Sequence, residues 1–254
     1  MGTGAITEYI DVAQLALYIF WIFFFLLVRH LHREGKREGW PLELDSRGQR
    51  FVEGFGGMPD PKTYRLANGQ GDRTYPGPAA AGYELKAVDT GKSPGDPIEP
   101  TGDPMVDGIG PAAWAIRPES PDLTVDGAPR IVPLRVDQDH KVNRRDPDPR
   151  GKPVSGCDGK VGGKVVDLWV DRAEPHFRYA EVDVGGHTVL LPMTMARVSR
   201  DGSVKVKSIR SDQFKQVPRL ANPDQVTLQE EDRITAFYGG GTLYALPERM
   251  GPVL

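Results

Sequence analysis

The chain of 254 residues has only one cysteine, Cys157. A single cysteine excludes a disulfide within the chain, and low cysteine content is typical of proteins from a reducing compartment. Small secreted folds held together by disulfides are therefore excluded. With no partner cysteine and no metal motif around it, Cys157 is expected to be buried and inert.

The sequence also lacks a strong excess of charge and the common nucleotide-binding motifs. Its 32 Lys and Arg and 35 Asp and Glu leave a net charge of −3, so no general attraction to nucleic acid is expected. No Walker loop or dinucleotide-binding glycine pattern occurs. The five histidines show no H-x-x-x-H spacing and have no cysteine near them, so we predict no metal site within the chain.

One motif resembles that of a nucleophile: Gly91-Lys-Ser-Pro-Gly95 matches the G-x-S-x-G pattern of serine hydrolases. That pattern requires a strand before the serine and a helix after it. Prolines at 94, 97 and 100 are incompatible with such a helix. A membrane-tethered hydrolase that uses Ser93 is thus the weakest of three candidate functions.

The chain does contain one long uncharged stretch, residues 12–28, in which Gln14 is the only strongly polar side chain. As a helix it would be roughly 26 Å long, close to the thickness of the hydrocarbon core of a bilayer. It has neither the polar face of a core helix nor the basic start and cleavage site of a signal peptide. We predict a transmembrane helix that is capped by Asp11.

The basic residues that flank this helix all follow it. They are Arg29, Arg33, Lys36 and Arg37. Because Lys and Arg are enriched on the cytoplasmic side of membrane helices, residues 1–11 are placed outside the cytoplasm and the rest of the chain inside it. We expect a helical extension over residues 29–40, contact of these basic side chains with lipid headgroups, and Trp40 at the membrane interface.

The next segment, residues 41–129, is rich in glycine and contains many of the 23 prolines. This composition disfavours a self-contained fold. Scattered large side chains such as Tyr64, Leu85 and Trp114 nevertheless indicate a chain that lies against a surface. We expect an extended segment with short strands near 62–67 and 83–88, which packs on partner subunits or on the C-terminal domain.

Residues 130–254 contain closely spaced strand patterns. They lie at 131–136, 165–170, 177–184, 188–191, 196–199 and 204–208. Glycines at 162–163, 185–186 and 202 are expected in the turns between strands. The predicted fold class is a single transmembrane helix followed by a mainly β domain, a small antiparallel β-barrel.

A helix is predicted at the end of this domain. Thr227-Leu-Gln-Glu230 has the form of a capping box, so the helix is expected from Leu228 to Tyr238. The glycines at 239–241 are expected to end it. The acids at 230–232 are interpreted as an ordinary acidic first turn, favoured by the helix dipole.

Acidic residues are concentrated on and after the predicted strand 165–170. Alternation along the strand directs one set of side chains into the core: Val166, Leu168 and Val170. The opposite face carries Trp169 and several acids, which continue beyond the strand: Asp167, Asp171, Glu174, Glu181 and Asp183. Two interpretations remain open, a solvated strand face or a coupled set of carboxylates that holds a proton near neutral pH.

Several short motifs are spread over nearly the whole chain and occur in a fixed order. They include Arg37-Glu-Gly-Trp-Pro-Leu42, Pro100-Thr-Gly-Asp-Pro-Met105, Gly110-Pro-Ala-Ala-Trp114, Val166-Asp-Leu-Trp-Val-Asp171 and Val226-Thr-Leu-Gln-Glu-Glu-Asp232. Each motif is weak alone, but their order behind one N-terminal apolar helix is specific. With them, the chain resembles the H subunit of the purple-bacterial photosynthetic reaction centre.

The resemblance implies a fold and a set of partners. H subunits have a periplasmic N-terminus, one helix across the bacterial inner membrane and a cytoplasmic PRC-type β-barrel, and they bind no cofactor alone. They cap the L and M subunits, which carry bacteriochlorophyll, bacteriopheophytin, quinones and non-haem iron. Light-harvesting antenna α/β polypeptides often surround the complex, and a cytochrome subunit is a further candidate partner.

The resemblance also implies a role for particular residues. H subunits are not catalytic themselves; they shield the quinone sites from water and help protons to reach the secondary quinone. The proton-pathway carboxylates of the family fall on Asp171 and Glu174. The surface loop where protons enter falls on residues 122–130, which contain Asp122 and Asp126 but no histidine.

A second function comes from a different class of protein. A membrane-tethered PRC-barrel adaptor with no part in photosynthesis would share the helix and the barrel. Bacteriochlorophyll absorption that co-purifies with the chain from native membranes would favour the reaction-centre function over the adaptor.

The positive flank of the helix generates a prediction about topology. If the domain after residue 40 is cytoplasmic, protease added to intact cells or right-side-out vesicles will leave it uncut. Permeabilised vesicles provide the control, in which the same protease degrades it. Cleavage of this domain from outside the intact cell would contradict the orientation.

Overall fold

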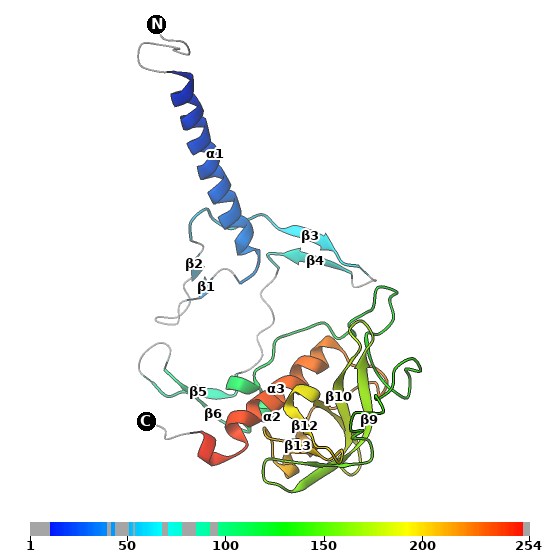
Figure 1. Cartoon of the computed structure of the whole chain (residues 1–254). Coiled ribbons are helices and arrows are strands. Elements are labelled where there is room, and N and C mark those ends of the chain that lie inside the picture. The colour runs from blue at the N-terminus through cyan, green and yellow to red at the C-terminus, as the bar shows by residue number, and fades with distance from the viewer. Residues whose placement is uncertain are drawn as a thin grey trace. The chain divides into compact units, whose positions relative to one another are not determined.

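In the computed structural model (Figure 1) the chain forms two compact units, residues 1–84 with 91–97 and residues 85–90 with 98–254. Within them the structure describes residues 11–39, 42–43, 51–52, 54–67, 71–77, 85–91 and 96–250. Trp40, predicted at the membrane interface, and Ser93 of the hydrolase motif lie outside the described residues.

The first unit begins with a long helix, α1 (Val12–Glu34), which continues into a 3-10 turn, η1 (Gly35–Arg37). Asp11 caps α1 as predicted, because its Oδ1 accepts a hydrogen bond of 2.7 Å from the amide of Gln14. No residue of α1 is buried within the chain. By length and composition the helix is able to cross a bilayer, and water would be a poor solvent for so much apolar surface.

Two small antiparallel pairs of strands follow α1 in the first unit. β1 (Leu42–Glu43) pairs with β2 (Phe51–Val52), and β3 (Lys62–Arg65) pairs with β4 (Asp72–Tyr75). β3 confirms the strand expected near 62–67. β4 was not predicted from the sequence.

Basic side chains at the end of α1 hold the segment that follows. Arg33 donates a hydrogen bond of 3.0 Å to the carbonyl of Met58, and Arg37 donates to the carbonyls of Asp60 and Tyr75 at 2.6 and 3.0 Å. Lys36, only 1% exposed, donates to the carbonyl of Phe55. These cations therefore have a structural role within the chain, and their contact with lipid headgroups stays a prediction.

The second unit begins with a hairpin and two short helical turns. β5 (Ala87–Asp89) pairs with β6 (Ile98–Pro100), and α2 (Pro104–Asp107) and η3 (Gly110–Ala112) follow. The strand expected near 83–88 lies partly outside the described residues, and its observed part is shifted towards the C-terminus as β5.

A curled seven-stranded sheet forms the body of the second unit. Its strands are β7 (Ile131–Pro133), β8 (Pro153–Ser155), β9 (Val161–Asp171), β10 (His176–Asp183), β11 (Thr188–Pro192), β12 (Ala196–Val198) and β13 (Val204–Val206). The order is β11-β10-β9-β8-β13-β12, with β7 also paired to β9. The sheet confirms the predicted barrel architecture. It is mixed rather than purely antiparallel, because β8 and β13 run parallel.

The inward pattern predicted for strand 165–170 is wrong at Val166. Glu181 of β10 lies opposite Asp167, and the next residue of β10 lies opposite Val165, so Val166 is the extra residue of a β-bulge. Val166 is consequently 44% exposed, whereas Val165 is fully buried. Leu168 and Val170 are buried as predicted.

The turn predicted at glycines 162–163 is also wrong, since both residues lie inside β9. A Cβ at Gly162 would lie 2.4 Å from the ring of Phe214, and one at Gly163 would lie 2.6 Å from the carbonyl oxygen of Asp183. Close packing therefore requires these glycines. The turn before β9 lies around Gly159, and Cys157 beside it is partly exposed rather than buried as predicted.

Glycines 185–186 and 202 do lie in turns as predicted, with positive φ angles. Gly185 and Gly186 connect β10 to β11, and Gly202 connects β12 to β13. Each turn is closed by a backbone hydrogen bond between its flanking residues, Val184 to His187 and Ser199 to Ser203.

The C-terminal helix, α3 (Leu228–Tyr244), begins with the predicted capping box but does not end at its glycines. A Cβ at Gly240 would lie 2.5 Å from that of Ala112, and one at Gly241 would lie 2.5 Å from Ile209 Cγ2. α3 lies beside α2 (Figure 1), and its glycines allow η3 and the segment after β13 to approach its backbone closely. The glycine run is thus a packing surface inside the helix.

This packing predicts the effect of Gly241→Ala. Alanine favours a helix by about 1 kcal/mol over glycine, but the added methyl would collide with Ile209 and with the carbonyl of Ser208. We expect a net loss of roughly 1–3 kcal/mol, measured by urea unfolding of the full chain in detergent. Thr242→Ala, at the exposed neighbouring position, should change stability by less than about 0.5 kcal/mol. A stabilised Gly241→Ala protein would contradict the packing role.

Candidate functional site

Three segments that are distant in the sequence meet at the C-terminal end of β9. The loop 122–130 is closed by a hydrogen bond of 2.8 Å between the backbones of Thr124 and Ala128. Pro121 forms an isolated β-bridge with Thr227 just before α3. On the other side, Arg130 accepts a backbone hydrogen bond of 2.9 Å from Arg172. The loop therefore holds Arg130 against the last residue of β9.

That last residue is Asp171, which is fully buried. One of its oxygens accepts a hydrogen bond of 2.8 Å from Arg130 Nε, and the other accepts one of 3.2 Å from Arg178 Nε on β10. The amides of Ala173 and Glu174 donate to Asp171 Oδ1 at 3.0 and 3.1 Å. Four donors satisfy one carboxylate, as burial of a charge requires.

Arg130 brings together three of the four residues predicted for proton transfer. Besides Asp171, its guanidinium contacts Asp122 at 3.3 Å and Glu174 at 3.6 Å. The side chains of Asp122 and Glu174 are 41% and 68% exposed, so both open towards solvent in this chain. The fourth, Asp126, lies at the exposed tip of the loop and does not join the group.

Burial alone would raise the pKa of Asp171. The hydrogen bonds from Arg130 and from the amides of Glu174 and Ala173 outweigh this effect and lower the pKa of Asp171 to about 2. Hydrogen bonding to Asp171 likewise raises the pKa of Arg130. The acidic face was interpreted either as a solvated strand face or as carboxylates that hold a proton. Asp171 fits neither, because it is buried and, with its low pKa, ionised at neutral pH.

Two further acids of the predicted face, both buried, share the partly exposed side chain of Arg135. Arg135 donates to Glu181 at 2.5 Å and to Asp167 at 3.3 Å. Trp169, fully buried, donates its indole N–H to Glu181 at 3.0 Å. The segment after β7 covers this face of β9, so these carboxylates have a structural role in the domain. Asp183, at the far end of β10, is exposed.

One acid with a raised pKa was missed in the sequence. Glu231, interpreted above as part of an ordinary acidic helical turn, accepts a hydrogen bond of 2.7 Å from the hydroxyl of Tyr179, which is 5% exposed. Burial raises the pKa of Glu231, and the negative charges of Asp122 and Asp171 raise it further, against the opposing effects of Tyr179 and Arg178. Only the capping box, which orients the first turn of α3, hinted at this position.

A histidine also enters the neighbourhood from outside the loop. His140 lies in a pocket of about 580 Å³ that is lined by Asp126, Asp139, Arg172 and others. Its Nδ1 lies 2.8 Å from Asp137, a buried carboxylate that also accepts from Arg172 at 3.2 Å. Burial would raise the pKa of Asp137, but hydrogen bonds from the amide and ring of His140 and from Arg172 lower it. The loop 122–130 has no histidine of its own, but it shares this pocket with His140, which comes from the connection between β7 and β8.

Asp171, Glu174 and His176 offer ligand atoms within 4.8 Å of one another. Asp171 is already bound to two arginines, however, and their positive charges oppose a bound cation. This arrangement suits ionised carboxylates and proton exchange better than a metal. The absence of a metal site stays a prediction.

The two arginines around Asp171 predict an acid-dependent loss of stability. Because the pKa of Asp171 is about 2 in the folded chain and 3.8 ordinarily, its ionised form stabilises the fold above about pH 5. That contribution, roughly 2 kcal/mol, is lost as the pH falls through about 4 to 2. Asp171→Asn should therefore lower stability in urea unfolding at pH 7 and lose this deficit near pH 2. Asp126→Asn, at an exposed position, is the matched control, and equal losses in both variants would contradict the prediction.

Both parts of the chain match known protein families. Residues 4–136 match the family described as photosynthetic reaction centre, H-chain N-terminal region, and residues 141–213 match the PRC-barrel domain. The first match covers α1, the strands that follow it and the loop that presents Arg130. The second covers the body of the curled sheet. The chain therefore belongs to the family of photosynthetic reaction-centre H chains.

Proposed function

We propose that this chain caps the cytoplasmic face of the reaction-centre L and M subunits and helps to deliver protons to the secondary quinone. Membership in the H-chain family supports its place in a reaction centre. Under this proposal the pigments, quinones and iron reside in the partner subunits, and antenna polypeptides lie around the complex. The chain performs no redox chemistry itself.

The helix α1 supports the anchoring part of the proposal. All of its residues are exposed or half-buried within the chain, and its apolar surface needs lipid or apolar partner helices as a neighbour. The basic residues after it favour an N-terminus in the periplasm and a domain in the cytoplasm. A quinone that takes up protons from the cell interior would receive them on this cytoplasmic side.

The group around Arg130 is the observation that carries the proton-delivery part. Glu174 and Asp122 meet solvent on one side and share Arg130 with buried Asp171 on the other. Protons would be collected in the pocket of Asp126, Asp139 and His140, which ends at Ala173 beside this group. Acids and an imidazole on a solvent-exposed surface raise the local supply of protons.

The two arginines give the carboxylates different roles. Asp171 stays ionised and fixes Arg130 and Arg178 in place. Glu174, which is exposed to solvent, passes protons on, and Glu231, whose pKa is raised by burial, is the second proposed carrier. Assembly with L and M would cover Glu174 and place it between bulk water and the partner subunits.

The alternative function, a PRC-barrel adaptor unrelated to photosynthesis, has less support. The barrel alone would suit either function, but the H-chain match, over residues 4–136, includes only β7 of the barrel sheet. Co-purification of bacteriochlorophyll with the chain from native membranes tests the choice directly.

The proposal predicts the behaviour of Glu174→Gln in the assembled reaction centre. The side chain keeps its size and loses its titrating proton, so assembly and the first electron transfer to the quinone should be unchanged. The second electron transfer, which is coupled to proton uptake, should slow by at least about tenfold near pH 9, where protons are scarce. Flash-induced absorbance changes measure both steps, and a small weak acid in the buffer should partly restore the rate.

Two variants sharpen this experiment. Glu231→Gln should slow the same step, because it removes the titrating group of the second proposed carrier. Glu248→Gln, an exposed acid on η6 (Pro247–Arg249), should behave as wild type. If Glu174→Gln and Glu248→Gln give the same rates from pH 6 to pH 9, Glu174 does not carry protons.

A further inference from the structure

A groove with positive side chains runs along the hairpin of β12 and β13, separate from the Arg130 group. Two neighbouring pockets of about 430 and 670 Å³ share three cations as their wall: Arg197, Lys205 and Lys207. Arg200 adds a fourth cation to the larger pocket. Among the described residues that line either pocket, there is no Asp or Glu. The groove is therefore cationic in a chain whose net charge is negative.

The positions of two cations are unfavourable in the chain alone. Arg197 and Lys205 lie directly opposite each other in the antiparallel pair β12–β13, so their side chains leave the same face. Like charges at such positions destabilise a sheet. In the described part of the chain, neither side chain forms an ion pair or hydrogen bond. An anion between them would relieve this repulsion.

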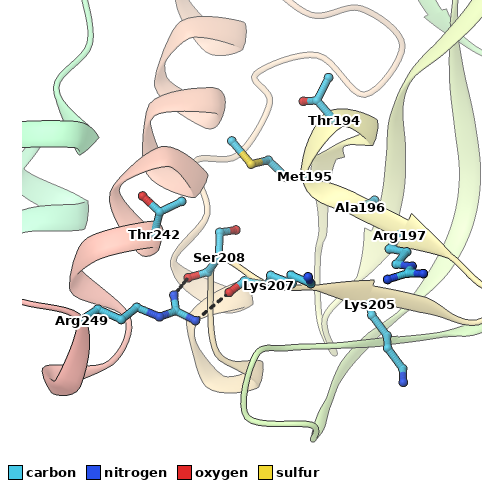
Figure 2. Close-up of a pocket in the computed structure, with 9 residues that line it drawn as sticks. All are labelled: Thr194, Met195, Ala196, Arg197, Lys205, Lys207, Ser208, Thr242 and Arg249. Atoms are coloured by element: carbon cyan, nitrogen blue, oxygen red, sulfur yellow. Dashed lines mark hydrogen bonds between the residues drawn. The ribbon is translucent and has the colours of Figure 1, made fainter.

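A second feature of the smaller pocket also points to a ligand. Ser208, just after β13, is 4% exposed, and its hydroxyl is buried without a hydrogen-bond partner among the described residues. Figure 2 shows Ser208 beside Thr242 of α3, with Met195 across the pocket. Arg249 does not compete for a ligand there, since its guanidinium donates to the carbonyls of Lys207, Ser208 and Gly241.

We propose that this groove binds an organic phosphate. The phosphate group lies over Arg197, Lys205 and Lys207, which supply charge-assisted hydrogen bonds to its oxygens. The uncharged remainder of the ligand enters the smaller pocket, where Met195 offers an apolar wall and Ser208 a hydroxyl without a partner among the described residues. A soluble phosphate ester and the headgroup of an anionic phospholipid share this chemistry.

The binding test uses the full chain in an uncharged maltoside detergent. Glycerol 3-phosphate, titrated by calorimetry, should bind saturably and more tightly than inorganic phosphate. Arg197→Gln and Lys205→Gln should each weaken binding about tenfold, the effect of losing one hydrogen bond to a charged group. Lys141→Gln, at an exposed basic position outside both pockets, is the matched control and should bind as wild type.

Two further readouts locate the ligand. Ser208→Ala should weaken binding of glycerol 3-phosphate but not of inorganic phosphate, because only the ester reaches the smaller pocket. Cys157, the single cysteine, lines the larger pocket. Bound phosphate should therefore slow its alkylation by a maleimide. Neither readout depends on electron transfer, so the outcome is independent of the proton-delivery proposal.

Mixed micelles distinguish the two sources of the phosphate. If phosphatidylglycerol, but not phosphatidylcholine, protects Cys157 and glycerol 3-phosphate does not, the ligand is a lipid headgroup. If glycerol 3-phosphate protects and phosphatidylglycerol does not, the ligand is a soluble ester. The proposal is overturned if no phosphate binds saturably, or if Lys141→Gln weakens binding as much as Lys205→Gln.

Discussion

The burial of the Asp171 carboxylate under two arginines is the constraint on which the end of the domain around Arg130 depends. A buried carboxylate without partners would be strongly destabilising, so Arg130, Arg178 and two backbone amides must be in place before β9 can end where it does. Arg130 in turn requires the loop 122–130, and that loop is joined to the start of α3. One ion pair thus fixes the relative positions of a loop, two strands and a helix.

The same ion pair separates structural acids from acids that can exchange protons. Asp171, Asp167 and Glu181 are buried against arginines, and for Asp171 this holds the pKa far below neutral. Glu174 and Asp122 lie at the rim of the group and meet solvent. Glu231, whose side chain accepts a hydrogen bond from the hydroxyl of Tyr179, has its pKa raised by burial. An arrangement with fixed ions inside and exchanging acids around them suits proton delivery without any change in fold.

Close backbone approach is the second constraint of the domain. Five glycines in β9 and α3 occupy positions where a Cβ would meet another segment at about 3 Å or less. They hold η5 (Ser211–Gln216) against β9 and η3 against α3. The sheet can therefore curl around a core that includes Trp169, and the cationic β12–β13 hairpin is left at its edge.

Local patterns were enough to predict α1 with its Asp11 cap, the capping box of Thr227, most strands and the turns at Gly185 and Gly202, because these features depend on neighbours in sequence. The acids Asp171 and Glu174 could also be found, through a motif. The bulge at Val166, the parallel pairing of β8 with β13, the helical glycines at 239–241 and the raised pKa of Glu231 could not. Each arises from contacts between residues far apart in the chain, and only the tertiary structure decides which segments meet, which charges are buried and which of them retain access to water.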